Sequence, residues 1–190
     1  MKKIILASGS PRRQELLKGL DLDFEVRLMK GIEESYPDDL PAVKVPEYIS
    51  KEKAAAYKVG EEEILITADT VVELDGKILG KPTDENDACR MLGELSGRTH
   101  QVVTGVTLTS AREQRSFSVI TEVTFKELTE KEIRYYVSHY HPLDKAGAYG
   151  IQEWIGYIGC VGLKGSYYNV MGLPVQRIYA ELKRMEASES

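Results

Sequence analysis

The chain has few of the residues that stabilise small secreted domains or bind zinc. Its 190 residues include two cysteines, Cys89 and Cys160, which lie far apart and belong to no CxxC or Cys/His pattern. We therefore expect two free thiols in a reducing compartment. The three histidines lack zinc-ligand spacing, and the sequence contains neither G-x-S-x-G nor H-E-x-x-H. The common zinc sites and the hydrolase chemistry that uses those two motifs are thereby excluded.

The chain also lacks a long hydrophobic run and an excess of basic residues. Its N-terminal apolar run, residues 4–7, is followed by polar SGSPRR and is too short for a signal peptide. No other segment approaches the length of a membrane span. The net charge of −5 opposes broad binding to nucleic acid or to anionic membranes. We expect a cytoplasmic protein that binds neither, although a local cluster of Lys and Arg can still hold a small polyanion.

The most informative segment is ASGSPRR at residues 7–13, which follows a short apolar strand. Ser10 suits the N-cap of a helix, and Pro11 suits its first position. Arg12 and Arg13 then fall in the first turn, where the helix dipole disfavours cations. An anion held by the helix N-terminus and both guanidinium groups would explain them. Two solvated arginines would explain them equally, and in either case we expect their removal to cost little stability.

The hydrophobic pattern predicts one α/β domain with a mixed sheet, because long antiparallel runs alternate with helices. Asp75-Gly76 predicts a hairpin turn, and Thr129 with Glu132 resembles a capping box. The predicted strands cover residues 4–7, 24–28, 64–74, 77–79, 100–109 and 116–125. The predicted helices cover residues 11–17, 47–59, 84–95 and 129–139, with a last helix after Pro174.

Asp69 is a carboxylate inside an otherwise apolar strand. Strand alternation places it on the face that carries Leu65, Thr67 and Val71. A carboxylate there is costly unless it is paired, bound to metal or open to a cleft. It is therefore either a functional acid or a strand-end residue that bonds nearby backbone groups.

Four other charged residues have two interpretations each. Lys53 and Lys81 are either phosphate ligands or solvated lysines. Neither Gly76-Lys77 nor Gly80-Lys81 is followed by the Ser or Thr of a Walker A motif. Glu33 and Glu34 follow a glycine in a predicted loop. They could complete an oxygen site for Mg²⁺ or Mn²⁺ with Asp69, or they could simply be hydrated.

The segment DKAGAYGIQ at residues 144–152 is rich in small residues. Small residues let a backbone approach a ligand closely. Gln152 offers both a donor and an acceptor for the edge of a base. An irregular turn without a ligand is an equal interpretation.

Six segments together resemble the Maf family of nucleoside triphosphate pyrophosphatases. They are ASGSPRR (7–13), ADTVV (68–72), GKP (80–82), SGRTHQVVTGV (96–106), DKAGAYGIQ (144–152) and GSYYNVMGLP (165–174). They occur in the family's order and cover nearly the whole chain, while residues 30–46 match little beyond Glu33. The resemblance implies a single domain over residues 1–190. Its implied fold is an elongated mixed sheet, with helices forming two lobes around a nucleotide cleft as in inosine triphosphatase.

The resemblance also implies a reaction and the residues that perform it. The reaction is hydrolysis of a nucleoside triphosphate to the monophosphate and pyrophosphate, with Mg²⁺ or Mn²⁺. Asp69 would be the proton acceptor or a metal ligand, and Glu33 would help to hold the metal. The phosphate ligands would be Ser8, Arg12, Arg13, Lys53 and Lys81. Specificity would depend on Arg12, Thr70 and Gln152.

The branch of the family is also indicated by the residues. Members that resemble this chain at Pro11-Arg12, Asp69-Thr70 and Gly150-Ile151-Gln152 act on dTTP and UTP. The branch that acts on 7-methyl-GTP carries a Trp in the first motif, a Gln after the aspartate and a Lys-Ser-Glu type ending, and this chain has none of these. We therefore expect dTTP and UTP as substrates, with related modified pyrimidine nucleotides as further ones.

A different class of function follows from the family's name, which refers to inhibition of septum formation. The alternative is a nucleotide-sensing regulatory protein. Asp69, Lys81 and Gln152 together favour catalysis, because a protein that only binds a nucleotide has no need of a base. The resemblance leaves a homodimer open.

Overall fold

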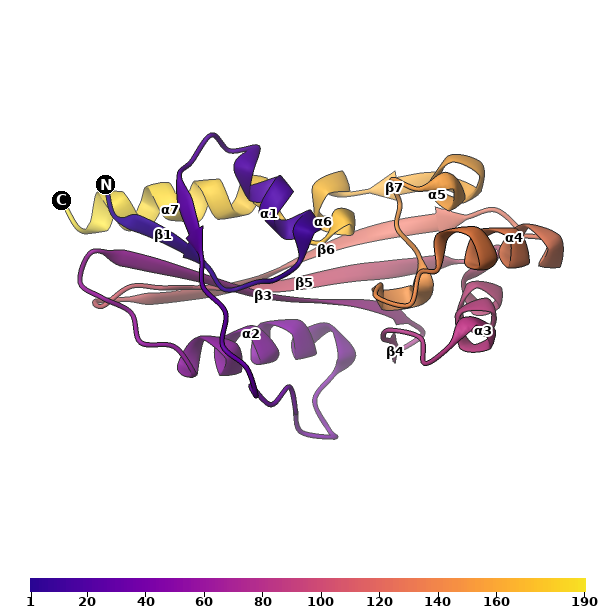
Figure 1. Ribbon diagram of the computed structural model, residues 1–190, viewed down its shortest axis with the longest axis horizontal. Coiled ribbons are helices and arrows are strands. Elements are labelled where there is room, and N and C mark those ends of the chain that lie inside the picture. The colour runs from indigo at the N-terminus through magenta and orange to yellow at the C-terminus, as the bar shows by residue number, and fades with distance from the viewer. The chain divides into compact units, whose positions relative to one another are not determined.

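The computed structural model describes residues 1–190, and Figure 1 traces the elements in chain order. The strands are β1 Lys3–Leu6, β2 Phe24–Val26, β3 Glu63–Leu74, β4 Lys77–Leu79, β5 Thr99–Thr109, β6 Gln114–Phe125 and β7 Cys160–Lys164. The helices are α1 Pro11–Lys18, α2 Val45–Ala55, α3 Glu85–Leu95, α4 Glu130–Tyr140, α5 Trp154–Gly159, α6 Tyr167–Met171 and α7 Val175–Ser188. Short 3₁₀ turns occupy Ala42–Lys44 and Ala146–Ala148.

The strands form one mixed sheet in the order β2-β1-β3-β5-β6-β7, with β4 also paired to β3. β1 is parallel to both β2 and β3, whereas the β3–β4 and β6–β7 pairs are antiparallel. The predicted mixed α/β sheet is therefore confirmed. The chain divides into two compact units, and β3, β5 and β6 each have residues in both. The first unit is residues 1–69, 104–119 and 172–190, and the second is residues 70–103 and 120–171.

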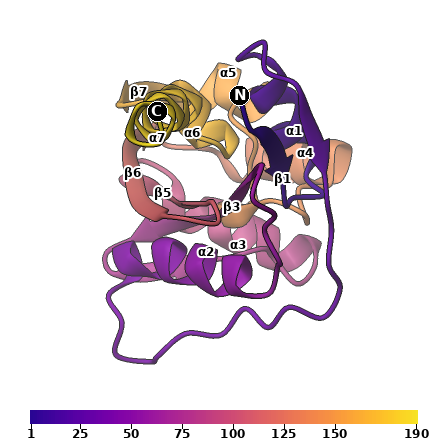
Figure 2. The same ribbon diagram turned by 90° about the vertical axis from the view of Figure 1, so that its left-hand side faces the viewer.

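The first unit is built on both faces of its part of the sheet. Figure 2 shows α2 on one face and α1 with α7 on the other. A small apolar cluster of Ile5, Leu65 and Ala54 joins β1 and β3 to α2. This unit carries the ASGSPRR segment, α2 and Asp69.

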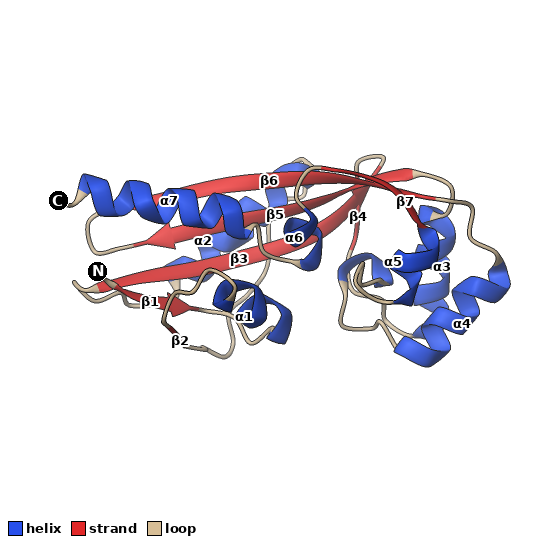
Figure 3. Ribbon diagram, turned by 90° about the horizontal axis from the view of Figure 1, so that it is seen from above, coloured by secondary structure: helices blue, strands red, loops and turns tan.

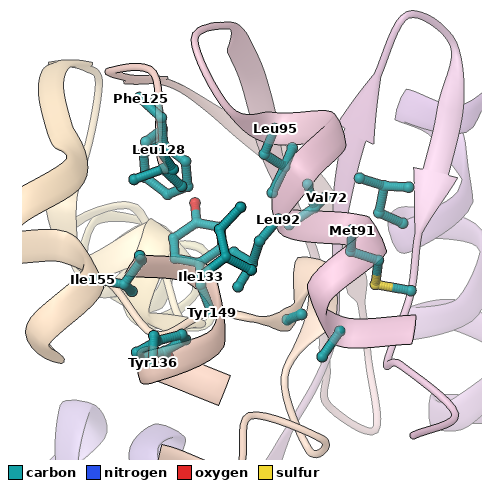
Figure 4. Packing of buried hydrophobic residues seen from close by; sticks show 14 of the residues in the cluster. Val72, Met91, Leu92, Leu95, Phe125, Leu128, Ile133, Tyr136, Tyr149 and Ile155 are labelled. Carbon is teal, nitrogen blue, oxygen red and sulfur yellow. The ribbon is translucent and has the colours of Figure 1, made fainter. Parts of the chain in front are cut away.

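The second unit packs α3, α4 and α5 around a larger apolar core, and Figure 3 shows these helices gathered together. α3 and α4 contribute amphipathic faces, including Leu92, Leu95 and Tyr136. Figure 4 shows the Tyr149 ring in the middle of this core, where it makes an edge contact with Phe125 at 4.9 Å between ring centroids. The segment that ends in Gln152 is therefore anchored in the core of its own unit.

Local sequence signals are confirmed where they were strongest. The Asp75-Gly76 turn joins β3 to β4, and the reciprocal bonds of the Thr129–Glu132 capping box are both present. Both cysteines are free thiols, as expected. No helix in the structure is long and apolar enough to span a bilayer.

The glycine-rich region after Gly147 differs from the prediction, which placed no regular element there. The structure has α5, β7 and α6 in this region, each only five or six residues long. Elements this short do not show a hydrophobic period. Gly156 lies within α5 rather than in a loop, and the position requires a glycine because a Cβ there would collide with the Ile151 carbonyl.

Candidate active site

The loop before α1 is fixed by side-chain bonds to its own backbone. The Ser10 Oγ accepts from the Arg13 N–H at 3.3 Å, which confirms Ser10 as the N-cap, and Pro11 is the first helical residue. The Ser8 Oγ accepts from the Ser10 N–H at 3.2 Å. Gln14 Nε2 donates to the Ser8 carbonyl at 3.2 Å. The first turn contains no acidic residue, so its positive end faces this loop without a carboxylate of its own.

Arg13 is more deeply integrated into the fold than its sequence context predicts. Its Nε donates to the Gly172 carbonyl at 2.9 Å, and its Nη1 donates to the Ala68 carbonyl at 3.4 Å. Burial lowers the pKa of Arg13, and the nearby Asp69 carboxylate opposes that shift. These bonds argue against the expectation that removing Arg13 costs little stability, because the Gly172 carbonyl would lose this donor and the Ala68 carbonyl would keep only Lys53.

Lys53 reaches the same backbone oxygen as Arg13. Its Nζ donates to the Ala68 carbonyl at 3.0 Å and lies 3.7 Å from Asp69 Oδ1. A carbonyl oxygen has two lone pairs and can accept both donors. Two cationic side chains therefore converge where β3 reaches Asp69, one from α1 and one from α2.

The position of Lys53 depends on how closely α2 packs on the sheet. Gly105 of β5 lies against the backbone of the first turn of α2, where a Cβ has no room. The Ser50 and Thr107 hydroxyls share a buried hydrogen bond of 2.7 Å, and the Thr67 hydroxyl donates to the Ser50 carbonyl at 2.7 Å. These contacts hold α2, and with it Lys53, in a defined position above Asp69.

Asp69 combines partial burial with nearby cations. Its side chain is 19% exposed. Burial raises the pKa of Asp69, while Lys53 and Arg13 oppose the rise and Glu34 adds to it. A partly buried carboxylate whose pKa is raised, held beside two cations, has the properties of a general base.

Glu34, the neighbour of the predicted metal ligand Glu33, lies next to these residues. Its Oε1 is 3.2 Å from Lys53 Nζ, and its charge influences both Arg13 and Asp69. Glu33 is exposed on the same loop. Both glutamates are candidate metal ligands from the sequence, and only the family resemblance selects Glu33. No group of three or more His, Cys, Asp or Glu side chains is arranged to hold a metal ion.

A surface hollow in the first unit collects several of the predicted site residues. Its lining combines small residues of the ASGSPRR segment with apolar side chains of the loop after β2 and with charged groups from three elements. The lining includes Ser8, Gly9, Arg13, Glu34 and Lys53, together with Leu28, Met29, Ile32 and Tyr57. Arg12 lies partly buried in the first turn of α1, and its charge acts on Arg13.

Three predicted site residues belong to the second unit. Thr70 directly follows Asp69 in β3 and is partly exposed. Lys81 is exposed in the loop after β4. The carbonyl of Gly80, the residue before Lys81, accepts from the Gly147 N–H at 3.1 Å. Gln152 has a buried Oε1 atom with no hydrogen-bond partner. A buried acceptor in this condition costs free energy.

Sequence reasoning missed the backbone groups that organise these side chains. The Ala68 carbonyl orients both Lys53 and Arg13, and a carbonyl has no signature in a sequence. The residues around Gln152 that bond to its turn were also missed, because Tyr136 lies in a different helix and looks like an ordinary core residue. One sequence signal could have indicated the role of Tyr136: it is a tyrosine, rather than a phenylalanine, on the apolar face of α4, and a buried tyrosine hydroxyl usually has a hydrogen-bond partner.

Comparisons with known proteins agree with the six sequence motifs. The model of the family described as "Maf-like protein" matches residues 3–185. A protein of Phocaeicola vulgatus named "dTTP/UTP pyrophosphatase" is 62% identical over 185 residues, covering 96% of each chain. A protein of Bacteroides thetaiotaomicron with the same name is 57% identical, again with 96% of each chain covered.

A solved structure, a nucleoside-triphosphatase described as a dITP/XTP pyrophosphatase from Mycobacterium abscessus, is 15% identical with a TM-score of 0.45. That alignment covers 98% of this chain and 97% of the other. The family match spans nearly all of the sequence, and relatives more than half identical cover almost the same residues. This chain therefore belongs to the Maf-like protein family.

Proposed function

We propose that this protein hydrolyses dTTP and UTP to the nucleoside monophosphate and pyrophosphate. The observation that carries the proposal is the convergence of Arg13 and Lys53 on the Ala68 carbonyl, beside the partly buried Asp69. Cations next to a base suit a reaction in which a polyanion is attacked by water. The names of the two bacterial relatives support the same substrates.

The chemistry assigned to these residues is in-line displacement at the α-phosphorus. Asp69 accepts a proton from water as the water oxygen bonds to the α-phosphorus. The bond between that phosphorus and the oxygen leading to the β-phosphate breaks, and pyrophosphate leaves. Arg13 and Lys53 neutralise charge that develops on the phosphate oxygens, and they are already positioned before the substrate binds.

The remaining predicted residues take the roles that the family resemblance implies. Ser8 and Lys81 bind phosphate oxygens, as does Arg12 at the N-terminus of α1, where the helix dipole favours an anion. Arg12 also contributes to specificity, together with Thr70 and Gln152. Because the family model spans residues of both units, we propose that residues 1–190 work as one domain.

A divalent metal fits the donor set of the first unit. The carboxylates of Asp69 and Glu34 both lie near Lys53, and Mg²⁺ typically binds through one or two carboxylates plus water and substrate phosphate oxygens. A site with only two carboxylates is compatible with the lack of any group of three or more His, Cys, Asp or Glu side chains that could hold a metal ion. Asp69 with Glu34 or Glu33 would hold Mg²⁺ or Mn²⁺, and the metal would neutralise phosphate charge.

The test is pyrophosphate release from purified protein with Mg²⁺ or Mn²⁺. The panel contains dTTP, UTP, CTP and 7-methyl-GTP, and Asp69→Asn serves as the inactive control. We expect release from dTTP and UTP, with little from the other two. Preference for CTP or 7-methyl-GTP would refute the proposed specificity. Tight nucleotide binding without release would refute catalysis and support the nucleotide-sensing alternative.

A further inference from the structure

The ammonium group of Lys53 has as many acceptors around it as it has N–H donors. An ammonium carries three donors and accepts no hydrogen bond. Its Nζ lies 3.0 Å from the Ala68 carbonyl oxygen, 3.2 Å from Glu34 Oε1 and 3.7 Å from Asp69 Oδ1. The Lys53 side chain is only 16% exposed. A phosphate oxygen that binds to Lys53 must therefore take the place of one of these three acceptors.

The three acceptors differ in how firmly the fold holds them. Ala68 and Asp69 belong to β3, an interior strand of the sheet, and the Ala68 carbonyl also accepts from Arg13. The Asp69 side chain is 19% exposed, whereas that of Glu34 is 55% exposed. Glu34 lies in the segment 27–41, which contains no helix or strand. Water can solvate an exposed carboxylate that leaves its partner, so Glu34 is the acceptor that is displaced at the least cost.

Glu34 also lies among the groups to which phosphate binding is assigned. It lines the same surface hollow as Ser8, Arg13 and Lys53. Its charge acts on Arg13 and on Asp69 as well as on Lys53. A carboxylate and a phosphate present the same kind of charged oxygen to an ammonium group. The Glu34 carboxylate therefore sits where a phosphate oxygen would bind.

We propose that the Glu34 carboxylate is an internal competitor of the substrate's phosphate for Lys53. It pairs with Lys53 until a phosphate oxygen displaces it, and this pairing lowers the affinity of the hollow for polyanions. The inference rests on the proposed function, because it takes Lys53 as a phosphate ligand. The metal role of Glu34 is a second position of the same carboxylate, so the two effects are separated by measuring without metal.

The test is binding of pyrophosphate to the purified protein in EDTA, measured by calorimetry at constant pH and ionic strength. Pyrophosphate carries phosphate charge without a base or a sugar. Glu34→Gln removes the competing charge. Glu34→Asp keeps the charge but shortens the side chain by one carbon–carbon bond, about 1.5 Å, so that it no longer reaches Lys53. Glu33→Gln is the matched control, because it removes one exposed charge from the same segment. Thermal unfolding of each variant is recorded alongside.

We expect Glu34→Gln to lower the dissociation constant for pyrophosphate about fivefold, the scale of one ion pair. Glu34→Asp should lower it as well, although the charge of the segment is unchanged. Glu33→Gln should leave it within twofold of the wild type. All three variants should fold, because the substituted side chains are exposed.

The variants separate pairing with Lys53 from general repulsion between the segment and an anion. Equal gains in affinity for Glu34→Gln and Glu33→Gln would overturn the inference, because net charge alone would explain them. Wild-type affinity in Glu34→Asp would also overturn it, as would a lack of pyrophosphate binding by every protein tested. A wild-type protein that releases no pyrophosphate from dTTP or UTP would overturn the proposed function, whatever the binding measurements show.

Discussion

Replacing Gly105 with alanine should show that the packing of α2 on the sheet controls the activity that depends on Lys53 and Asp69. Gly105 lies in β5, and a Cβ there would overlap the backbone of Pro46 and Glu47 in the first turn of α2. Backbone atoms cannot rotate away as side-chain ends can. Because non-bonded atoms rest at about 3.5 Å, the helix must move on the order of 1 Å to accommodate the methyl group.

The movement of α2 also displaces Lys53, which lies near the C-terminal end of this helix. Lys53 lies two turns beyond the collision on the same rigid helix, where its Nζ is 3.0 Å from the Ala68 carbonyl and 3.7 Å from Asp69. A misplacement of about 1 Å at a positioned group can cost roughly 100-fold in rate. Overpacking of this kind costs about 1–3 kcal/mol of stability. We therefore expect Gly105→Ala to fold with a lower melting temperature and to lose about 100-fold in kcat/KM.

The assay is pyrophosphate release from dTTP, paired with thermal unfolding followed by circular dichroism. Gly93→Ala is the matched control, because Gly93 lies within α3 and a Cβ there meets no atom within 4 Å. That variant should keep wild-type activity and gain about 0.5–1 kcal/mol of stability from helix propensity. Wild-type kcat/KM and melting temperature in Gly105→Ala would refute the argument that this glycine sets the position of Lys53.

Four further predictions concern the charged residues of the first unit. Asp69→Asn should lower turnover by about 100-fold or more while the protein stays folded by circular dichroism. Burial raises the pKa of Asp69 above the ordinary value of 3.8, so its ionisation in the folded protein costs stability above that pH. The Asn variant should therefore melt at a higher temperature than the wild type at pH 7. For the wild type, the acid limb of the kcat/KM profile should lie above pH 3.8. Arg13→Ala should raise KM for dTTP and also destabilise the protein by about 1–3 kcal/mol, because the bonds from its guanidinium to two carbonyls are lost. Arg12→Ala should raise KM, and added salt should raise KM for the wild type; a salt-independent KM would count against the anion site. Glu34→Gln should weaken Mn²⁺ binding, measured by calorimetry with a non-hydrolysable dTTP analogue, more than Glu33→Gln does; the opposite order would return the metal role to Glu33.

Much of the secondary structure could be predicted because its signals are local. Ser10 caps α1 through the N–H of Arg13, three residues away, and Thr129 and Glu132 form their capping box over the same distance. Asp75-Gly76 also acts within its own hairpin. The short elements between Trp154 and Met171 were missed because five or six residues carry no readable period.

The sequence by itself determined the family, the α/β class and the residue types of the candidate site. It showed that two arginines occupy a helix start where a carboxylate would be expected, and that an aspartate interrupts an apolar strand. Those facts depend only on neighbouring residues and on motif order. They predict an anion site and an acid without locating the groups that orient them.

Only the tertiary structure decided which backbone groups hold the side chains in place. Arg13 bonds to Gly172, 159 residues away, and Tyr136 bonds to the turn that carries Gln152 from a separate helix. Every residue presents the same carbonyl, and every residue except proline presents the same N–H. The sequence therefore cannot indicate which backbone carbonyl or N–H will bond to a given side chain. Folding selects these partners by bringing distant segments together, so that a partly buried arginine at a helix start bonds to Gly172 and a core tyrosine bonds to the turn that carries Gln152.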